Sequence, residues 1–307
     1  MSETQVEQKL SSEEIATWMK RASYASASVA GLLIISKLMA WLWIDSVSLL
    51  ATLLDSCLDA VASLITLFAV RHALEPADSD HRFGHGKAES LAALAQSMFM
   101  TGSALFLMLA AFSRFFHPEP LQYVTIGLVV MVFSILSTLA LLSFQHMVIR
   151  KTSSVAIQAD AMHYKTDLYM NISVILALLL AYYGWSGFDV LFALGIGVFI
   201  LYSAWEIIQL ALKDLMDQEL SDDERENIRH IIIKHPKALG VHDLRTRKSG
   251  TTLFIQLHLE LNDDLPLIEA HAISDEVEAA LLEVYPCAEI IIHEDPVSSI
   301  NHHLLAS

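Results

Sequence analysis

The sequence Asp55-Ser-Cys-Leu-Asp59 places two carboxylates four residues apart within an otherwise apolar stretch that runs from Ser46 to about Leu74. A membrane-spanning helix needs about 20 mostly apolar residues, so the stretch is long enough to cross a bilayer. At a spacing of four, two helical side chains share one face, about 6 Å apart along the axis. Two ionised carboxylates side by side in a membrane are costly unless a cation lies between them. The stretch therefore predicts a metal-binding transmembrane helix; the alternative is a pair of protonated, packed acids.

The composition of the whole chain is that of a polytopic membrane protein. Of its 307 residues, 54% are hydrophobic and 18% charged, and the mean hydropathy is +0.47, which is too apolar for an ordinary soluble domain. Cys57 and Cys287 form neither a disulfide framework nor a paired-thiolate zinc motif. The net charge is −16, and residues 214–307 hold 19 acidic and seven basic residues. This acidity argues against a nucleic-acid partner and favours divalent cations.

Six apolar stretches predict six transmembrane helices embedded in a lipid bilayer. They lie at about Tyr24–Ile44, Ser46–Leu74, Ser90–Phe112, Val124–Gln145, Val155–Tyr183 and Phe188–Leu212. An even number of spans puts both termini on one side. The N-terminal segment and the second and fourth loops carry eight basic residues, whereas the opposite loops hold Arg114 alone. By the positive-inside rule, both termini face the cytoplasm.

After Lys213 the pattern changes to that of a small soluble domain. Ser221 followed by Glu224 is typical of a capped helix start, and Ser249-Gly250 is typical of a tight turn. The expected elements are a helix from Ser221 to about His235, strands at 241–248 and 252–261, a helix from about Leu267 to Tyr285 and a strand from Ala288 to His293. We therefore expect an α-helical polytopic membrane domain over 1–213, an α/β domain of order αββαβ over 214–298 and a tail over 299–307.

The fifth apolar stretch supplies further ligands at the depth of Asp55 and Asp59. His163 and Asp167 again share a helix face, and Asp160 lies nearer the cytoplasmic end, where it could act as an entrance charge. At 1.5 Å per residue, Asp55 and Asp59 lie about 13 and 19 Å from the outer end of their span, and His163 and Asp167 about 12 and 18 Å from the inner end of theirs. In a core about 30 Å thick the four meet near the middle. One imidazole and three carboxylates suit Zn²⁺, with Mn²⁺, Fe²⁺, Co²⁺ and Cd²⁺ as alternatives.

Two further groups of candidate metal ligands lie outside the predicted spans. The loop after the second span contains Asp78, His81 and His85, which could form a partial metal site or only a solvated polar turn. In the soluble domain the candidates come from three strands and one helix, and strand alternation can put several on one face. They are His242, His258, His271, His293 and Asp295.

These motifs together resemble the cation diffusion facilitator family along nearly the whole chain. The resemblance rests on the Asp55/Asp59 motif, on His-Tyr-Lys-Thr-Asp at 163–167 and on the loop at 78–89. It also rests on Val-His-Asp-Leu-Arg-Thr-Arg at 241–247 and Ile-Ile-Ile-His-Glu-Asp-Pro at 290–296. It implies a homodimeric, proton-coupled efflux carrier in the bacterial inner membrane. Its transport site would be Asp55, Asp59, His163 and Asp167, favouring Zn²⁺ and tolerating Cd²⁺.

The resemblance also assigns roles outside the transport site. It implies an auxiliary metal site in the loop and a binuclear Zn²⁺ site near the dimer interface of a metallochaperone-like domain. It implies a salt bridge between Lys87 and Asp217, for which generic surface charges are the alternative. Glu294 departs from the family pattern, in which a glutamine is expected between His293 and Asp295, and would alter the coordination there.

The leading function is therefore a non-enzymatic antiporter that exports Zn²⁺ and returns protons. Carboxylate and imidazole ligands must lose protons to bind a metal, so the two ions compete for one site. One alternative is an intramembrane zinc hydrolase, but the sequence contains no His-Glu-x-x-His, and four protein ligands leave no open position for water. The other is a membrane metal sensor in which the acidic domain is the functional part.

Overall fold

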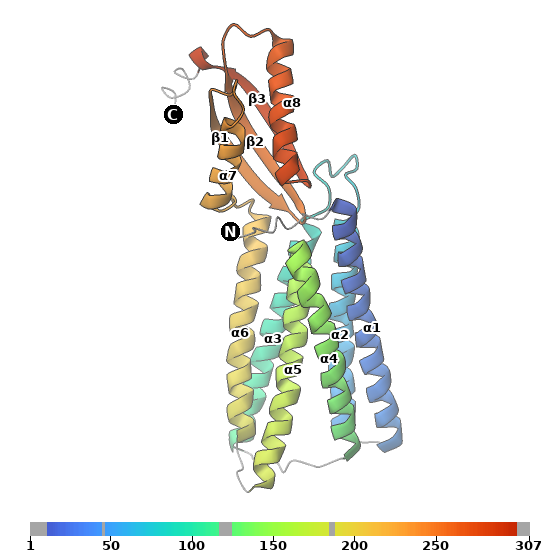
Figure 1. The fold of residues 1–307 in the computed structure, drawn as a ribbon. Helices are drawn as coiled ribbons and strands as arrows, with labels where there is room; N and C mark the ends of the chain where they lie inside the picture. The colour runs from blue at the N-terminus through green and yellow to red at the C-terminus, as the bar shows by residue number, and fades with distance from the viewer. Residues whose placement is uncertain (1–10, 45–46, 117–124, 184–187, 300–307) are drawn as a thin grey trace, which may run out of the picture. The chain divides into compact units, whose positions relative to one another are not determined.

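The computed structural model describes residues 11–44, 47–116, 125–183 and 188–299. The chain divides into two compact units (Figure 1): a helical unit from Ala16 to Leu212, and an α/β unit whose described residues are 11–15 and 213–299. Of the predicted tail, only Ser299 lies within the described residues.

Six long helices form the helical unit, as the sequence predicted. They are α1 (Ser12–Ile44), α2 (Val47–Ala73), α3 (Ala88–Phe116), α4 (Thr125–Thr152), α5 (Val155–Tyr182) and α6 (Phe188–Leu215). Within the described part of the chain, five of them, α1 to α4 and α6, are long and apolar enough to cross a membrane by length and composition. Helix α5 carries the charged residues Asp160, Lys165 and Asp167. The helices that pack against this polar face are described below.

Several helices extend beyond the apolar stretches that predicted them. Helix α1 starts at Ser12, about three turns before the expected span, because Ser11 and Glu14 cap it reciprocally. The Ser11 backbone N–H donates to Oε2 of Glu14 at 3.0 Å, and the Glu14 N–H donates to Oγ of Ser11 at 3.3 Å. This capping box satisfies two N–H groups that a helix start would otherwise leave without acceptors.

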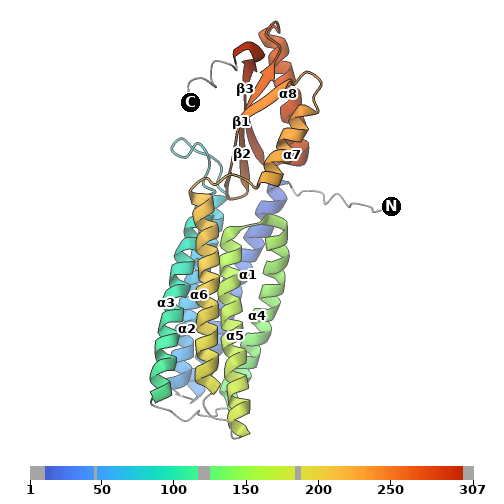
Figure 2. The same ribbon diagram turned by 90° about the vertical axis from the view of Figure 1, so that its left-hand side faces the viewer.

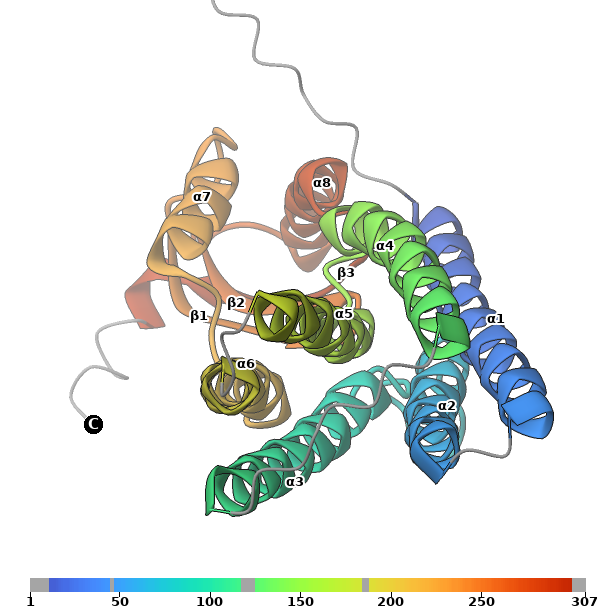
Figure 3. The ribbon, with the colours of Figure 1, turned by 90° about the horizontal axis from the view of Figure 1, so that it is seen from below.

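Helix α5 packs against α2, α3 and α4 (Figure 3). Small side chains allow this approach: Ala93 of α3, Ala159 of α5 and Ala211 of α6 are fully buried in one cluster. Without a large side chain between them, helix backbones can come close, which is the common means of packing helices in membranes. The polar face of α5 is thus enclosed by other helices.

The α/β unit has the predicted order αββαβ. Its elements are α7 (Asp222–Ile233), β1 (Gly240–Ser249), β2 (Thr252–Leu261), α8 (Leu267–Val284), β3 (Ala288–Pro296) and a short 3₁₀ turn (Val297–Ser299). Strand β2 is central, antiparallel to β1 and parallel to β3. Gly250 has φ +60°, so the predicted β1–β2 turn requires the left-handed region that glycine adopts without strain. The Ser221 hydroxyl accepts from the Glu224 N–H, which confirms the predicted cap.

One face of the sheet is apolar and the other is polar. Both helices cover the same face (Figure 2), and alternate β2 residues such as Ile255, Leu257 and Leu259 are buried against Ile228 of α7 and Leu281 of α8. Because strand side chains alternate, the intervening β2 residues point away from the helices. This alternation leaves the polar face free for the histidines described below.

Candidate metal centres

The first candidate metal centre joins α2 to α5 within the helical unit. Asp59, His163 and Asp167 each offer a ligand atom within 4.8 Å of the others. Nε2 of His163 lies 3.1 Å from Oδ1 of Asp59 and 3.7 Å from Oδ2 of Asp167. Asp59 and His163 are only 8% and 6% exposed. The imidazole nitrogen therefore stands between two carboxylates, one from each helix, in a protected position.

One atom of this cluster has no hydrogen-bond partner in the described part of the chain. Oδ2 of Asp167 is buried and accepts no hydrogen bond, since His163 is too far away for one. Leaving a buried acceptor unsatisfied is costly, and a bound cation would satisfy it. Asp55 lies one helical turn before Asp59 and is exposed; it is not part of the three-residue group.

A buried hydroxyl network fixes how α2 faces α5. The Tyr164 hydroxyl lies 2.8 Å from Oγ of Ser63 and 3.3 Å from the Ser26 carbonyl, and the Ser26 hydroxyl donates to Ser63 at 3.0 Å. Tyr164 directly follows His163, and Ser63 is one turn after Asp59. The network therefore links α1, α2 and α5 next to the metal centre and sets their relative depth. Sequence reasoning missed it, although serines and a tyrosine in apolar helices were a signal.

Lys37 of α1 places a positive charge beside the same cluster. Its ammonium group donates to the Thr52 carbonyl at 3.1 Å and to the Ser56 hydroxyl. It lies near enough to attract the carboxylates of Asp55 and Asp167. An ionisable residue within a membrane helix is costly and is usually functional. Lys37 therefore offsets part of the repulsion among the acids, a role that the sequence analysis did not assign.

Asp160 is a buried structural acid, which makes its prediction as an entrance charge wrong. It is 1% exposed. Gln145 of α4 donates to its Oδ2 at 2.6 Å, and Gln96 of α3 donates to its Oδ1 at 3.4 Å. The sequence could place Asp160 near the end of a helix, but only helix packing decides whether that end is open to water. Here α3 and α4 close over it.

Removing the Asp160 carboxylate should destabilise the helical unit. In Asp160→Ala both amide donors lose their acceptor, at a cost of roughly 1–3 kcal/mol for each buried group left unpaired. We expect a clearly lower unfolding temperature in detergent, and a smaller decrease for Asp160→Asn, which keeps one acceptor oxygen. His146→Ala is the matched control because His146 is exposed on α4 beside Gln145. An Asp160→Ala protein that unfolds at the wild-type temperature would contradict this role.

The second candidate centre is the loop between α2 and α3. Asp78, His81 and His85 offer ligand atoms within 4.8 Å of one another. Oδ1 of Asp78 accepts from the N–H of His81 at 2.6 Å and of Asp80 at 2.9 Å. These backbone hydrogen bonds, that from His81 above all, hold the pKa of the Asp78 carboxyl below its usual range. Asp78 is therefore ionised at neutral pH and suited to a cation.

The third candidate centre is a row of histidines across the polar face of the sheet. The strand register pairs His242 with His258 and His258 with His293, so the three imidazoles lie side by side. Oδ2 of Asp295 lies 2.7 Å from Nδ1 of His258 and 3.2 Å from Nε2 of His242, and its Oδ1 lies 3.3 Å from Nε2 of His293. His242, His258 and Asp295 each offer a ligand atom within 4.8 Å of the other two.

The surroundings explain the charge on Asp295 and add two acids that sequence reasoning missed. Burial by itself would raise the pKa of Asp295, but the hydrogen bond with His258 and the nearby His293 and His242 outweigh it and lower that pKa. Nδ1 of His242 lies 2.9 Å from Oε1 of Glu260. A bulge in β1 after His242 turns Asp243 to 3.8 Å from His258.

Three further expectations concern residues outside the histidine row. His271 is on α8, which packs against the opposite face of the sheet, and its Nε2 lies 3.8 Å from Oδ2 of Asp275. Glu294 accepts from the Ser274 hydroxyl of α8 at 2.9 Å; it therefore points away from the histidine row and adds no carboxylate there within the chain. Asp217 pairs with Arg247 at 3.3 Å in its own unit, and the salt bridge to Lys87, in the other unit, stays a prediction.

Comparison with known proteins then decides the family. Residues 23–216 match the model of the cation efflux transmembrane domain, and residues 220–297 match that of the cation efflux protein cytoplasmic domain. The chain belongs to the cation efflux family. It is 52% identical over 287 residues, 94% of this chain and 96% of the relative, to the cation-efflux pump FieF of Yersinia pestis (strain Pestoides F). The same values hold for FieF of Yersinia pseudotuberculosis serotype O:3 (strain YPIII).

Membership of the cation efflux family makes the chain a transporter of cations and not an enzyme. The helical unit is its transmembrane part, and the α/β unit is its cytoplasmic domain. A solved structure of CzrB in its Zn form is 38% identical, covers 27% of this chain and 94% of that chain, and superposes with a TM-score of 0.26. The two family models together cover both units of the chain.

Proposed function

We propose that this cation efflux protein is an antiporter that exports Zn²⁺ from the cytoplasm in exchange for protons. The observation that carries the proposal is the enclosed Asp59–His163–Asp167 cluster, in which a buried carboxylate oxygen has no hydrogen-bond partner in the described chain. One imidazole with carboxylates is a ligand set that suits Zn²⁺ and also accommodates Cd²⁺, Fe²⁺ and Mn²⁺. Asp55, one turn before Asp59, would provide the fourth ligand.

The geometry of His163 supports competition between the metal and a proton. Its Nε2 lies 3.1 Å from Oδ1 of Asp59, a contact that requires a proton between the two atoms because two lone pairs would repel. When His163 is doubly protonated, binding of a metal ion at Nε2 must release a proton from the ring. The cluster would then hold either that proton or Zn²⁺, which is the requirement for exchange at one site.

Alternating exposure of this one site to the two sides of the membrane would couple the two flows. The six helices are proposed to cross the inner membrane with both termini in the cytoplasm, as the basic loops indicate. Two copies are proposed to associate through their cytoplasmic domains, and the histidine row there is proposed to bind regulatory Zn²⁺. A pure sensor would bind metal in the same domain without moving it, so flux distinguishes the two functions.

The decisive experiment measures ion flux in proteoliposomes. Purified protein is reconstituted with a metal-sensitive dye inside the vesicles and a pH-sensitive dye in parallel samples. We expect Zn²⁺ and Cd²⁺ uptake with proton movement in the opposite direction, and slower or no transport of Mg²⁺ and Ca²⁺, which prefer all-oxygen sites. Metal uptake that causes no proton movement would refute antiport, and the absence of any metal uptake would favour the sensor.

The histidine row should regulate transport and not carry the ion. Binding of Zn²⁺ to associated cytoplasmic domains stabilises the association by mass action. The double variant His242→Gln/His293→Gln should therefore lose most of the Zn²⁺-dependent increase in dimer stability and transport several-fold more slowly. His230→Gln, an exposed histidine on α7, is the matched control and should behave as wild type. Complete loss of flux in a folded, dimeric double variant would contradict the regulatory role.

A further inference from the structure

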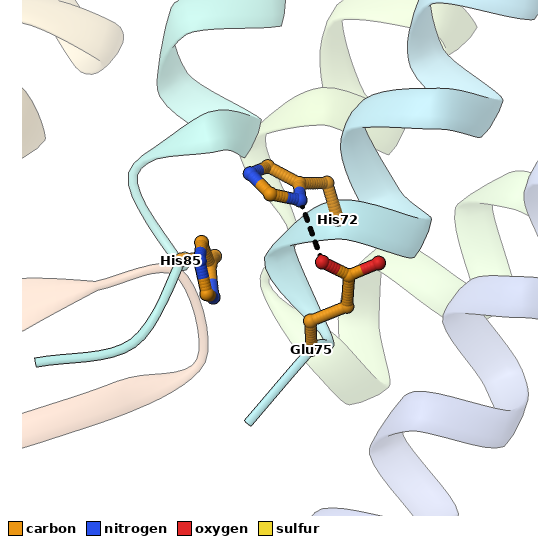
Figure 4. A group of neighbouring side chains, drawn as sticks. All are labelled: His72, Glu75 and His85. Atoms are coloured by element: carbon orange, nitrogen blue, oxygen red, sulfur yellow. Dashed lines mark hydrogen bonds and ion pairs between the residues drawn. The ribbon is translucent and has the colours of Figure 1, made fainter. Parts of the chain in front are cut away.

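A second group of potential metal ligands surrounds His85, where α2 ends. His72 lies in the last turn of α2, and Glu75 follows in the first residues of the loop. Together with His85 they offer three ligand atoms within 4.8 Å of one another. Figure 4 shows His72 and Glu75 joined by an interaction, with His85 facing them from the other arm of the loop. Neither His72 nor Glu75 belongs to the ligand sets described above.

The backbone holds His72 and Glu75 in position. The Glu75 N–H donates to the His72 carbonyl at 3.0 Å, which closes the end of the helix with a tight turn. Nδ1 of His72 lies 2.8 Å from Oε2 of Glu75. The ring centroid of His85 lies 4.4 Å from that of His72 and 4.7 Å from that of His81. His85 is therefore the member that both groups share.

The two ring nitrogens of His85 have different surroundings. Nε2 lies 3.3 Å from Oδ2 of Asp78. Nδ1 is buried and has no hydrogen-bond partner in the described part of the chain, and the side chain as a whole is 6% exposed. A buried ring nitrogen without a partner is uncommon because it loses its hydration without compensation. A metal ion bound to Nδ1 would remove that cost.

We propose that His72, Glu75 and His85 form a second binding position for a divalent transition-metal ion such as Zn²⁺. Two imidazoles and a carboxylate are a ligand set that Zn²⁺ takes with water in its remaining position. A neutral imidazole has one lone pair, so His85 binds one metal ion at a time. The loop therefore holds one ion, either with Asp78 and His81 or with His72 and Glu75.

Small side-chain movements are sufficient for binding. Two atoms that each lie about 2.1 Å from one ion can be at most about 4.2 Å apart, so a spread of up to 4.8 Å must close slightly. His72 and Glu75 can move, since their side chains are 53% and 59% exposed. The C-terminal end of α2 also favours a cation, because the last carbonyl groups of a helix carry partial negative charge.

The simpler interpretation is an ion pair between His72 and Glu75 with no metal. Exposed pairs of this kind contribute little to stability, and the pair does not involve Nδ1 of His85. The metal interpretation accounts for the buried Nδ1 of His85, which the ion pair leaves without a partner in the described part of the chain. It concerns binding alone and does not depend on the direction or coupling of transport.

Binding of Co²⁺ tests the proposal in the full-length protein, because its visible absorption is strong in four- or five-coordinate protein sites and weak in water. The parent carries Asp59→Asn and His258→Gln, which weaken the other centres. Equilibrium dialysis and absorption then compare four derivatives: Asp78→Asn/His81→Gln, His72→Gln/Glu75→Gln, all four of these changes together, and His85→Gln. His146→Gln, on an exposed residue of α4, is the control. Size-exclusion chromatography verifies that each variant is folded.

We expect about one Co²⁺ bound by the loop in the parent and in each double derivative, and at least about tenfold weaker binding in the quadruple derivative and in His85→Gln. The spectrum should change between the two double derivatives because their ligands differ. The proposal would be overturned if Asp78→Asn/His81→Gln bound no Co²⁺ at the loop. It would also be overturned if adding His72→Gln and Glu75→Gln to that derivative did not weaken binding. Two ions per loop in the parent would overturn the sharing of His85.

Discussion

Replacing Asp59 by asparagine is expected to reduce Zn²⁺ transport at least about 100-fold, more than the 10- to 100-fold typical of residues that only support a metal ligand. Asparagine keeps the shape of the side chain but loses its charge. The buried carboxylate of Asp167 and the imidazole of His163 would then face a much weaker ligand. Transport of Zn²⁺ into proteoliposomes at saturating concentration is the measurement.

The neighbouring residue Cys57 provides the control for the loss of transport. It lies on the same helix two positions earlier and is exposed, away from the cluster. Cys57→Ala should transport at the wild-type rate, and Asp167→Asn should fail in the same way as Asp59→Asn. All three variants should remain folded by size-exclusion chromatography. Flux near the wild-type rate in Asp59→Asn would remove Asp59 from the transport site.

An imposed proton gradient should have the other large effect. Acid on the side toward which the metal moves should accelerate transport. Once the shared site is exposed to that side, protons displace Zn²⁺ from its ligands. Acid on the side of metal entry should slow transport, because protons occupy the ligands first. Because protons and Zn²⁺ compete for the same ligands, the affinity for Zn²⁺ rises with pH. Initial rates at several inner and outer pH values measure the effect.

His163 should contribute to this pH dependence. A doubly protonated imidazole must lose a proton before it can bind Zn²⁺. His163→Ala should therefore bind Zn²⁺ more weakly and with a flatter dependence on pH. Calorimetry in buffers of different ionisation enthalpy counts the protons released, once the loop and cytoplasmic centres are disabled. Zero proton release with intact transport would mean that Zn²⁺ moves alone.

Periodicity in the sequence was sufficient to predict the elements of both units. Apolar stretches long enough to span a membrane gave the six helices, and alternation around Ser249-Gly250 gave the hairpin of the α/β unit. Such patterns are local: each depends on residues within one helix or one strand. For the same reason the sequence paired His163 with Asp167 and Asp55 with Asp59, since residues four apart share a helix face.

Contacts between elements were beyond the reach of those patterns. Depth along two helices suggested that Asp59 and His163 could meet, but the rotation of α2 against α5 depends on Tyr164 and Ser63, which periodicity does not single out. The same limitation made Asp160 seem open to water, although Gln96 and Gln145 enclose it. Whether a helix face is buried depends on which helices pack against it.

The sequence by itself determined the class of protein, the order of its elements and the residue types able to bind a metal ion. Only the tertiary structure decided which of these residues meet. Strand register brought three histidines into one row and turned Glu294 toward Ser274. The path of the loop between α2 and α3 placed His85 beside His72. The physical reason is that metal ligands must lie within a few ångströms of one ion, whereas local periodicity carries no information on distances between elements.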